Sequence, residues 1–287
     1  MTKKPSLAIL GGSGLYEMEG LENTEQVSPK TPFGEPSAPI TIGDLEGQRV
    51  AFLARHGIGH HHNPTEINYR ANIYALKSLG VTRVVGVSAC GSLREDYEPG
   101  HIVIPDQLFD FTKDRERSFF TDGMVAHIDT ADPFCPDTAQ QAYDAVTKTG
   151  ATVHQGGTFI TIEGPRFSTK AESHLFRQWG MDIIGMTTSP EAYLAREAEL
   201  CYAVIGHITD YDVWHVSEEP VTVEMVIKTL NRNTDVAQQA IRNLARDLDP
   251  ERDCACARAL ATAFITDPGV IPAETRQRLS LLVDKYL

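Results

Sequence analysis

Residues Glu66–Ser92, EINYRANIYALKSLGVTRVVGVSACGS, contain the two patterns that decide the fold. The first half repeats apolar side chains at helical intervals over 66–79 and ends at Gly80, which can adopt the left-handed conformation that stops a helix. The second half, Arg83–Ser88, is a short apolar run typical of a buried strand. A helix that leads directly into a buried strand indicates an α/β fold.

The same two patterns recur along the chain. Further runs typical of buried strands are Leu7–Leu10, Pro39–Ile42, Arg49–Leu53, Ile102–Pro105, Gly157–Ile162, Asp182–Met186 and Tyr202–Ile208. Further amphipathic helical patterns cover Lys170–Gly180, Pro190–Glu199, Val223–Leu248 and Pro272–Leu287. Because no repeat or low-complexity segment separates them, we expect a single α/β domain whose sheet is mainly covered on both faces.

Composition excludes several classes of protein. Apolar residues make up 41% and charged residues 23% of the 287, close to the average for globular proteins. The net charge of −13 argues against a broad nucleic-acid surface, so any bound phosphate should be small and locally held. The sequence has no signal peptide pattern and no apolar run long enough to span a bilayer. We expect a cytoplasmic enzyme.

The five cysteines are an odd number in a long chain without a secretion signal, which favours reduced thiols over a disulfide framework. Cys254 and Cys256 form a C-x-C pair that could close a strained bridge or supply part of a metal site. No CxxC partner or His cluster lies near them in the sequence to complete a zinc site. We therefore expect plain reduced thiols.

Four strand ends carry residues suited to an anion. Ser13 lies in the turn GGSG after the first strand, although this turn matches neither a dinucleotide fingerprint nor a P-loop and a simple tight turn explains it equally well. Arg55 and His56 follow another strand, where a guanidinium fork and an imidazole donor suit phosphate oxygens. Ser88 opens the small-residue run SACGS, and Thr187 precedes a helix that begins at a proline.

Two tempting readings lack support. The run GHHHNP at 59–64 suggests a metal, but adjacent histidines point in different directions and no nearby carboxylate has ligand spacing, so we expect no metal. Cys90 in SACGS could be a nucleophile, but the run is not GxSxG and no base is evident.

Candidate groups for a sugar and a base lie in later segments. Phe167 could form a flat wall for a base, although an isolated Phe is more often core. Ser168 or Thr169 can cap the next helix, with Glu172 three residues after Thr169. Met186 could pack on a ribose, although it equally suits core filling.

Asp210 and Asp212 follow the last strong strand beside large aromatic residues. Two carboxyls in a partly apolar pocket can have displaced pKa values, and one could hold a proton for donation. A glycosidase-like pair is an alternative, but carboxyls at i and i+2 of an extended segment start on the same side only a few ångströms apart. Either acid could instead be structural.

Six segments taken in order resemble the methylthioadenosine phosphorylase branch of the purine nucleoside phosphorylase family. They are GGSGLYE, FLARHG, SACGSL, TIEGPRFSTKAES, WGMDIIGMTTSPEAYLAREAELCYA and ITDYDVW. The resemblance extends from about Leu7 to Leu248 and is loose beyond.

The resemblance implies a mixed, partly barrel-like sheet flanked by helices. It implies one phosphorylase domain over 1–287, with a core of about 7–248 and a C-terminal helical extension of about 249–287. It also implies a homotrimer, with a hexamer left open, and inorganic phosphate as co-substrate with no metal or organic cofactor. Some heat-stable relatives carry a similar C-terminal C-x-C pair in oxidised form.

The resemblance assigns a role to each matching position, with Asp210 and Asp212 as catalytic candidates. Phosphate would be held by Ser13, Arg55, His56, Ser88, Ala89 and Thr187; Met186 would pack on the ribose; Phe167, Ser168, Asp210 and Asp212 would surround the base; His127 would come from the neighbouring subunit and His60 would lie near the 5' end.

Base preference follows from two positions. Relatives that act on inosine and guanosine carry Asn where this chain has Asp210, and Glu where it has Ser168. A carboxyl at Asp210 accepts from the amine of adenine and, when protonated, donates to N7, whereas an amide has no such proton. We therefore expect a 6-aminopurine and, at the 5' position, an apolar pocket formed by Val223, Val226 and Ile227.

The expected reaction is phosphorolysis of S-methyl-5'-thioadenosine to adenine and 5-methylthioribose 1-phosphate. Three alternatives remain: the same chemistry on 5'-methylthioinosine or purine nucleosides in general, a nucleosidase that uses water, and a nucleoside-binding module without turnover.

Overall fold

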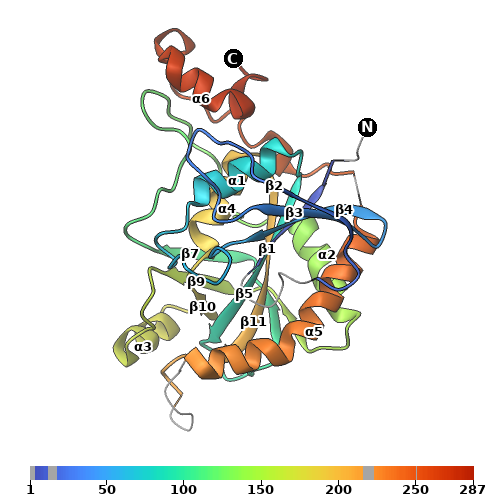
Figure 1. Cartoon of the computed structure of the whole chain (residues 1–287). Helices are drawn as coiled ribbons and strands as arrows, with labels where there is room; N and C mark the ends of the chain where they lie inside the picture. Colours follow the sequence, from blue (N-terminus) through green and yellow to red (C-terminus); the bar gives the residue numbers. More distant parts are fainter. Residues whose placement is uncertain (1–3, 12–17, 216–222, 250) are drawn as a thin grey trace.

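One mixed sheet forms the centre of the protein (Figure 1). The computed structural model describes residues 4–11, 18–215, 223–249 and 251–287, of which 225–233 are described by their backbone. Within these residues the sheet has eleven strands: β1 (Leu7–Gly11), β2 (Glu22–Val27), β3 (Ile40–Leu45), β4 (Gln48–Ala54), β5 (Arg83–Ser92), β6 (Ile102–Ile104), β7 (Gln107–Phe111), β8 (Val153–Gln155), β9 (Thr158–Ile162), β10 (Ile183–Gly185) and β11 (Cys201–Asp210). All eight predicted strands are confirmed.

The strand order brings several carboxyl ends to one edge. The main path is β2-β3-β4-β1-β5-β10-β9-β7, and β11 also pairs with β5. β1 is parallel to both β4 and β5, and β11 is parallel to β5. β10 runs antiparallel to the last residues of β5, with Ile184 opposite Gly91. The ends of β4, β5 and β11 therefore meet at the place where parallel sheets bind ligands.

Five of the six α-helices that the structure describes agree with the predicted patterns within a few residues at each end, and α2 was not predicted. The six are α1 (Tyr69–Ser78), α2 (Pro136–Thr147), α3 (Lys170–Gln178), α4 (Thr188–Glu197), α5 (Val223–Asp247) and α6 (Ala273–Val283), with 3-10 turns η1 (Ala255–Arg258) and η2 (Pro268–Val270). Gly80 ends the first helical segment at φ 93°, as predicted. Thr169 and Glu172 form the predicted reciprocal cap at the start of α3.

Both faces of the sheet are covered, as predicted. Alternate residues of β1 show this directly: Leu7 and Ile9 pack with residues of α2 and α5, whereas Ala8 and Leu10 pack with residues of α1 and α4. Figure 1 shows these helix pairs on opposite sides of the sheet. Strands buried on both faces need continuous apolar runs, which is why the sequence predicted them well.

Three strands and one helix in the described residues were not predicted: β7, with the sequence QLFDF, and β2, β8 and α2, which lack a strong apolar pattern. β2 reads ENTEQV, and its first five residues are exposed. β8 has three residues, none of them fully buried. The buried face of α2 consists mainly of Ala142, Ala145 and Val146, whose side chains are too small to stand out in the sequence.

The sequence predicts plain reduced thiols at Cys254 and Cys256, and the structure places them in a cluster that the sequence does not show. All five cysteines are free thiols, but Cys254 and Cys256 are buried in one cluster with Cys135 and Cys201. The sequence could not indicate this because 53 residues separate Cys201 from Cys254 and the fold alone brings them together.

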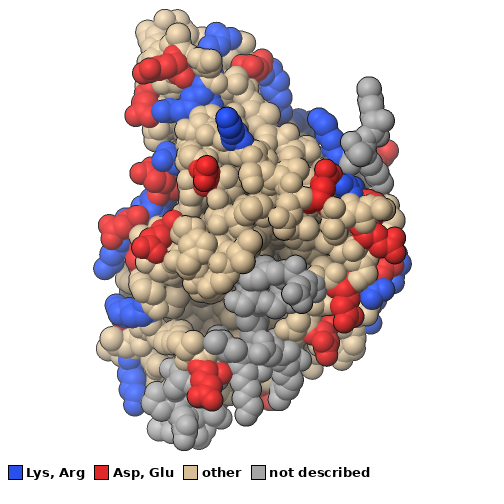
Figure 2. Space-filling view, viewed as in Figure 1, with Lys and Arg blue, Asp and Glu red and all other residues tan. Residues whose placement is uncertain are grey.

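The surface is mixed in charge. On the face shown in Figure 2, basic and acidic groups are interspersed, mainly around the periphery. In the described part of the chain, no helix combines the length and the apolar character that crossing a bilayer requires.

Candidate active site

A cavity of about 740 Å³ lies at the shared edge of β4, β5 and β11. It brings together most of the predicted site residues: Arg55, His56, His60, Ser88, Ala89, Phe167, Ser168, Met186, Thr187, Asp210, Asp212 and Val223. The first and last of these residues, Arg55 and Val223, are more than 160 positions apart in the chain. The sequence predicted most of the cavity residues at separate strand ends, and the fold brings them together.

Some predicted residues are not placed in this cavity. Ser13 lies outside the described residues, as do the side chains of Val226 and Ile227. His127 is exposed and does not line the cavity of its own chain, and its backbone N–H donates to Ala263. Its contribution to a neighbouring subunit stays a prediction.

Arg55 is positioned by the end of β4, where its backbone N–H donates to Gly11. Its side chain is 2% exposed, and Nε and Nη2 donate to the two carboxylate oxygens of Glu191 at 2.5 and 3.0 Å. Nη2 also donates to the carbonyl of Leu10, and Nη1 to that of Val87. Four of the five guanidinium N–H groups thus have protein acceptors. Glu191 occupies the guanidinium fork, which leaves one N–H of Nη1 for a ligand.

The ion pair sets the electrostatics around Arg55. Burial disfavours the charged guanidinium, but the carboxylate of Glu191 more than offsets this and raises the pKa of Arg55 above its ordinary value. The hydroxyl of Tyr202 donates to the same carboxylate at 2.7 Å. A Cβ at Gly86 would lie 2.7 Å from that hydroxyl, so the strand passes too close for a larger residue here. The cation is held firmly at the cavity wall and its charge is compensated.

His56 is neutral at physiological pH. Burial and the nearby charge of Arg55 lower its pKa to about 4. Its Nδ1 lies 3.0 Å from the carbonyl oxygen of His62. A carbonyl only accepts, so Nδ1 carries the hydrogen and Nε2 presents a lone pair. The sequence predicted an additional donor at this position, whereas the tautomer in the structure makes Nε2 an acceptor.

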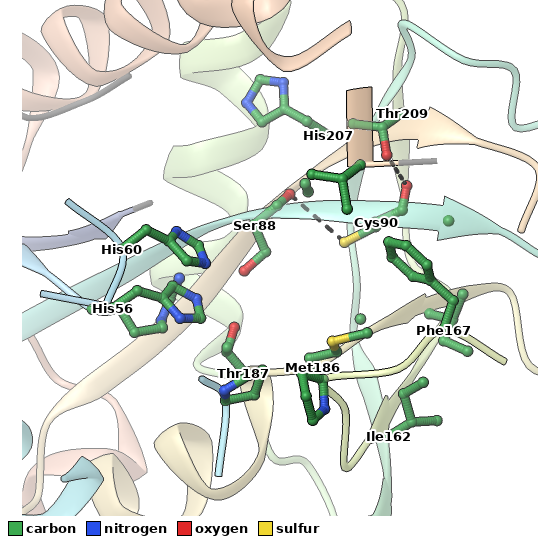
Figure 3. Close-up of a pocket in the computed structure, with 18 of the residues that line it drawn as sticks. His56, His60, Ser88, Cys90, Ile162, Phe167, Met186, Thr187, His207 and Thr209 are labelled. Carbon is green, nitrogen blue, oxygen red and sulfur yellow. Dashed lines mark hydrogen bonds between the residues drawn. The ribbon is translucent and has the colours of Figure 1, made fainter. Parts of the chain in front are cut away.

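Two hydroxyls complete this end of the cavity. Figure 3 shows the side chains of Ser88 and Thr187 directed toward each other, with His56 beside them. The Ser88 hydroxyl is buried without a hydrogen-bond partner among the described residues. Thr187 precedes α4, but its side chain makes no capping hydrogen bond. We call His56, Ser88 and Thr187 the hydroxyl end; two hydroxyl donors that face each other suit an anion.

Asp210 is the last residue of β11 and is 8% exposed. Its Oδ1 accepts from the backbone N–H of Asp212 at 2.8 Å, and its Oδ2 lies 2.6 Å from the hydroxyl of Thr209. Burial raises its pKa to about 6, although these two hydrogen bonds oppose the shift. A carboxyl with this pKa can hold a proton near neutral pH and donate it.

Asp212 lies beside Asp210 but outside the strand, at φ 51°. Burial raises its pKa as well. The hydroxyls of Ser173 and Ser168 lie beside its carboxyl and oppose this shift, and the Asp212 Oδ2 and the Ser168 hydroxyl are both buried and make no well-aligned hydrogen bond among the described residues. Buried polar groups without partners are costly, so these groups are suited to a polar ligand. We call Asp210 and Asp212 the acid end of the cavity.

Apolar side chains lie between the two ends. Figure 3 shows Met186 between Thr187 and Phe167, with Ile162 behind them. Phe167 is 37% exposed, which is high for a large aromatic residue in a core. Its position on the cavity wall indicates that the Phe167 ring serves as a contact surface for a ligand and does not fill the core.

Three groups in or behind the cavity were not predicted. Glu191 and Tyr202 hold Arg55, and nothing in the sequence indicates a contact between residues 136 positions apart. His207 lines the cavity with both ring nitrogens buried and without partners among the described residues, and burial lowers its pKa to about 4. The sequence signal for His207 is weak because a histidine inside a strand more often belongs to the core.

Comparison with known proteins places the chain in a family. Residues 6–246 match the model of the phosphorylase superfamily, and the chain belongs to this family. Over 98% of its length it is 54% identical to a Geobacter sulfurreducens protein named S-methyl-5'-thioadenosine phosphorylase, of which it covers 99%. It is 53% identical over 91% of its length to a Hyperthermus butylicus protein of the same name, of which it covers 96%.

Solved structures agree with this placement. The crystal structure of a methylthioadenosine phosphorylase from an antarctic soil metagenomic library has a TM-score of 0.93 and 47% identity, covering 98% of this chain and 99% of that one. A variant of the adenosine/methylthioadenosine phosphorylase of Schistosoma mansoni, in complex with methylthioadenosine, has a TM-score of 0.81 and 35% identity. It covers 87% of this chain and 93% of that one.

Proposed function

We propose that this protein cleaves S-methyl-5'-thioadenosine with inorganic phosphate, releasing adenine and 5-methylthioribose 1-phosphate. The observation that carries the proposal is the division of the cavity into a hydroxyl end and an acid end with apolar side chains between them. Relatives about half identical over nearly the whole chain bear the name of this activity. In chemical terms the protein is a pentosyltransferase.

Phosphate would bind at the hydroxyl end. Ser88 and Thr187 would donate to its oxygens beside the first turn of α4, and the remaining Nη1 hydrogen of Arg55 would add a donor. Nε2 of neutral His56 would accept from a P–OH group. This pattern suits the monohydrogen form of phosphate, which offers both a hydroxyl and charged oxygens. Backbone groups of Ala89 and the turn around Ser13 belong to the same prediction.

The nucleoside would extend from the hydroxyl end to the acid end. Its sugar would lie against Met186 and its purine beside Phe167, with Ser168 and Asp212 able to bind polar edges of the base. Val223 lines the cavity and suits an apolar 5' substituent near His60. A ligand of this shape would occupy both ends at once.

The chemistry follows from this placement. As the bond between C1' and N9 breaks, the sugar develops positive charge, which the phosphate beneath it stabilises. A phosphate oxygen then forms the new bond to C1'. The leaving purine takes the electron pair of the broken bond, and protonated Asp210 donates its hydrogen to N7. The raised pKa of Asp210 supports this role, because an ordinary aspartate would hold no proton near neutral pH. Neither a metal nor an organic cofactor takes part in these steps.

Several finer properties belong to the same proposal. The chain would act as one phosphorylase domain over residues 1–287 and assemble as a homotrimer in the cytoplasm. The exposed position of His127 supports a contribution to a neighbouring subunit. Five thiols without a disulfide suit a reducing compartment.

One experiment separates this function from its alternatives. Release of adenine from S-methyl-5'-thioadenosine is measured with and without phosphate, beside release of hypoxanthine from 5'-methylthioinosine. We expect rapid adenine release only with phosphate, and slower hypoxanthine release. Equal turnover without phosphate would make the protein a nucleosidase, faster hypoxanthine release would reverse the base preference, and calorimetric binding without turnover would leave a binding module.

A further inference from the structure

Four cysteines meet in the interior, and none of them lines the cavity. They are Cys135 at the N-terminus of α2, Cys201 at the start of β11, and Cys254 and Cys256 around η1. Their four sulfur atoms all lie within 4.8 Å of one another, and each residue is at most 8% exposed. The four thus form one compact group of sulfur ligands.

The arrangement suits a tetrahedral metal better than disulfides. Zinc bound by four thiolates at about 2.3 Å holds the sulfur atoms about 3.8 Å from each other. The sulfurs of Cys201 and Cys254 are 3.2 Å apart, well beyond the roughly 2.05 Å of a disulfide, and all four thiols are free. In a pair of disulfides each sulfur would have one close partner, whereas here each sulfur has three neighbours.

The surroundings of the cluster favour the negative charge that thiolate ligands bring. The guanidinium of Arg252 donates to the sulfur of Cys201 at 3.5 Å while it also holds backbone carbonyls at Thr82 and Glu199. Cys135 is the residue immediately before α2, where the helix dipole is positive, and the hydroxyl of Thr138 lies 3.5 Å from its sulfur. Four thiolates around a divalent ion carry a net charge of −2, which such groups stabilise.

We propose that Cys135, Cys201, Cys254 and Cys256 bind one structural Zn²⁺ ion. Four protein ligands and full burial leave no open position for substrate, which is typical of a structural site. The ion joins the turn η1 to the start of β11 and to α2. It would therefore fasten the C-terminal part of the chain, from residue 251 onward, to the strand that carries Asp210 at its other end.

The contacts of the C-terminal part support this role. The backbone N–H of Leu260 donates to the carboxylate of Glu199 at 3.2 Å, and Arg83 donates to the carbonyl of Glu251 at 2.5 Å. Glu251 and Leu260 lie on either side of η1 in the sequence. The cluster therefore lies between two hydrogen bonds that hold the C-terminal part against the rest of the protein. The segment also buries Leu260, Leu279 and Leu282 in the main core, so a metal would add to an attachment that apolar packing already makes.

The first test uses the unaltered chain. Full-length protein without a histidine tag is produced in zinc-supplemented medium, dialysed against a weak chelator and analysed by inductively coupled plasma mass spectrometry. We expect about one zinc per chain, four sulfur neighbours at about 2.3 Å in the X-ray absorption spectrum, and release of that zinc as an organomercurial consumes four thiols. Intact-mass evidence for two disulfides, four titratable thiols without metal, or iron in place of zinc would each overturn the proposal.

A matched pair of variants assigns the ligands. Cys254→Ser combined with Cys256→Ser should lower bound zinc to below about a tenth of a molar equivalent, because two ligands cannot hold a structural ion. Cys90→Ser removes the one cysteine outside the cluster and should keep the full equivalent. Equal zinc in both variants would contradict the assignment. The measurements on the unaltered chain decide the question if the double variant does not fold, and none of them depends on the proposed enzymatic activity.

Discussion

The two ends of the cavity handle charge in opposite ways. At the hydroxyl end the nearby cation, Arg55, is paired with Glu191, and His56 is held neutral. At the acid end burial raises the pKa values of Asp210 and Asp212, which favours a bound proton there. At the hydroxyl end the carboxylate of Glu191 compensates the charge of Arg55 permanently. At the acid end a proton that can be donated reduces the charge of the carboxyls. Only the acid end is therefore built to change its charge during a reaction.

The largest expected effect comes from replacing Asp210, the carboxyl that can donate a proton. Asp210→Asn keeps the shape of the side chain but cannot deliver a proton to N7, so phosphorolysis of S-methyl-5'-thioadenosine should fall by about 10²–10⁴-fold. Phosphate binding, measured by calorimetry, should be unchanged because phosphate belongs to the other end. The exposed Asp249→Asn is the control. Turnover close to that of the unaltered chain would exclude Asp210 as the acid.

Replacing Glu191, the ion-pair partner of Arg55, should lower the stability of the fold. Glu191→Gln would leave the guanidinium of Arg55 buried without its counter-charge, which should lower the free energy of unfolding by about 3–5 kcal/mol in urea titrations. The control is Glu116→Gln, which breaks a surface ion pair with Arg70 and should cost at most about 1 kcal/mol. Similar losses in both variants would mean that the buried pair is not what holds this end together.

The same contrast explains which parts of the site the sequence could predict. Ser88 lies in β5 and Asp210 ends β11, and because these two strands are parallel neighbours, the meeting of the two residues was predictable. Thr187 follows β10, which runs antiparallel to β5, so its place beside Ser88 depends on the sheet order that the fold adopts. The Arg55–Glu191 pair was not, because it depends on how α4 packs against the sheet. The tautomer of His56 depends on a loop carbonyl at His62, which no pattern in the sequence specifies.

The fold shows the same division. Strands buried on both faces, such as β1 and β11, were predicted because burial demands continuous apolar runs. The exposed strand β2 has no such demand and was not predicted. The cysteine cluster was not predicted for a related reason: its ligands come from three separate segments, and only the C-x-C pair is visible in the sequence.

Stability should depend on pH through the acid end. The folded protein keeps the proton of Asp210 up to a pKa of about 6, whereas the unfolded chain loses it near 3.8. This group therefore stabilises the fold fully below about pH 4, and its contribution is lost as the pH rises through 6, a change of about 3 kcal/mol at most. Urea titrations from pH 4.5 to 7.5 should show a component of this sign that Asp210→Asn lacks and Asp249→Asn retains. A difference between the two variants that is constant with pH would show that Asp210 does not titrate in this range.

The smallest expected effect tests the hydroxyl end itself. Thr187→Val keeps the shape of the side chain and removes one donor to phosphate, so the KM for phosphate should rise about tenfold while kcat changes less. Thr188→Val is the matched control, because the Thr188 hydroxyl is buried beside it without a partner among the described residues and does not line the cavity. Its KM for phosphate should stay the same. If the two variants behave alike, or if Thr187→Val lowers kcat and leaves KM unchanged, the hydroxyl end is not where phosphate binds, and the contrast between the two ends loses its chemical meaning.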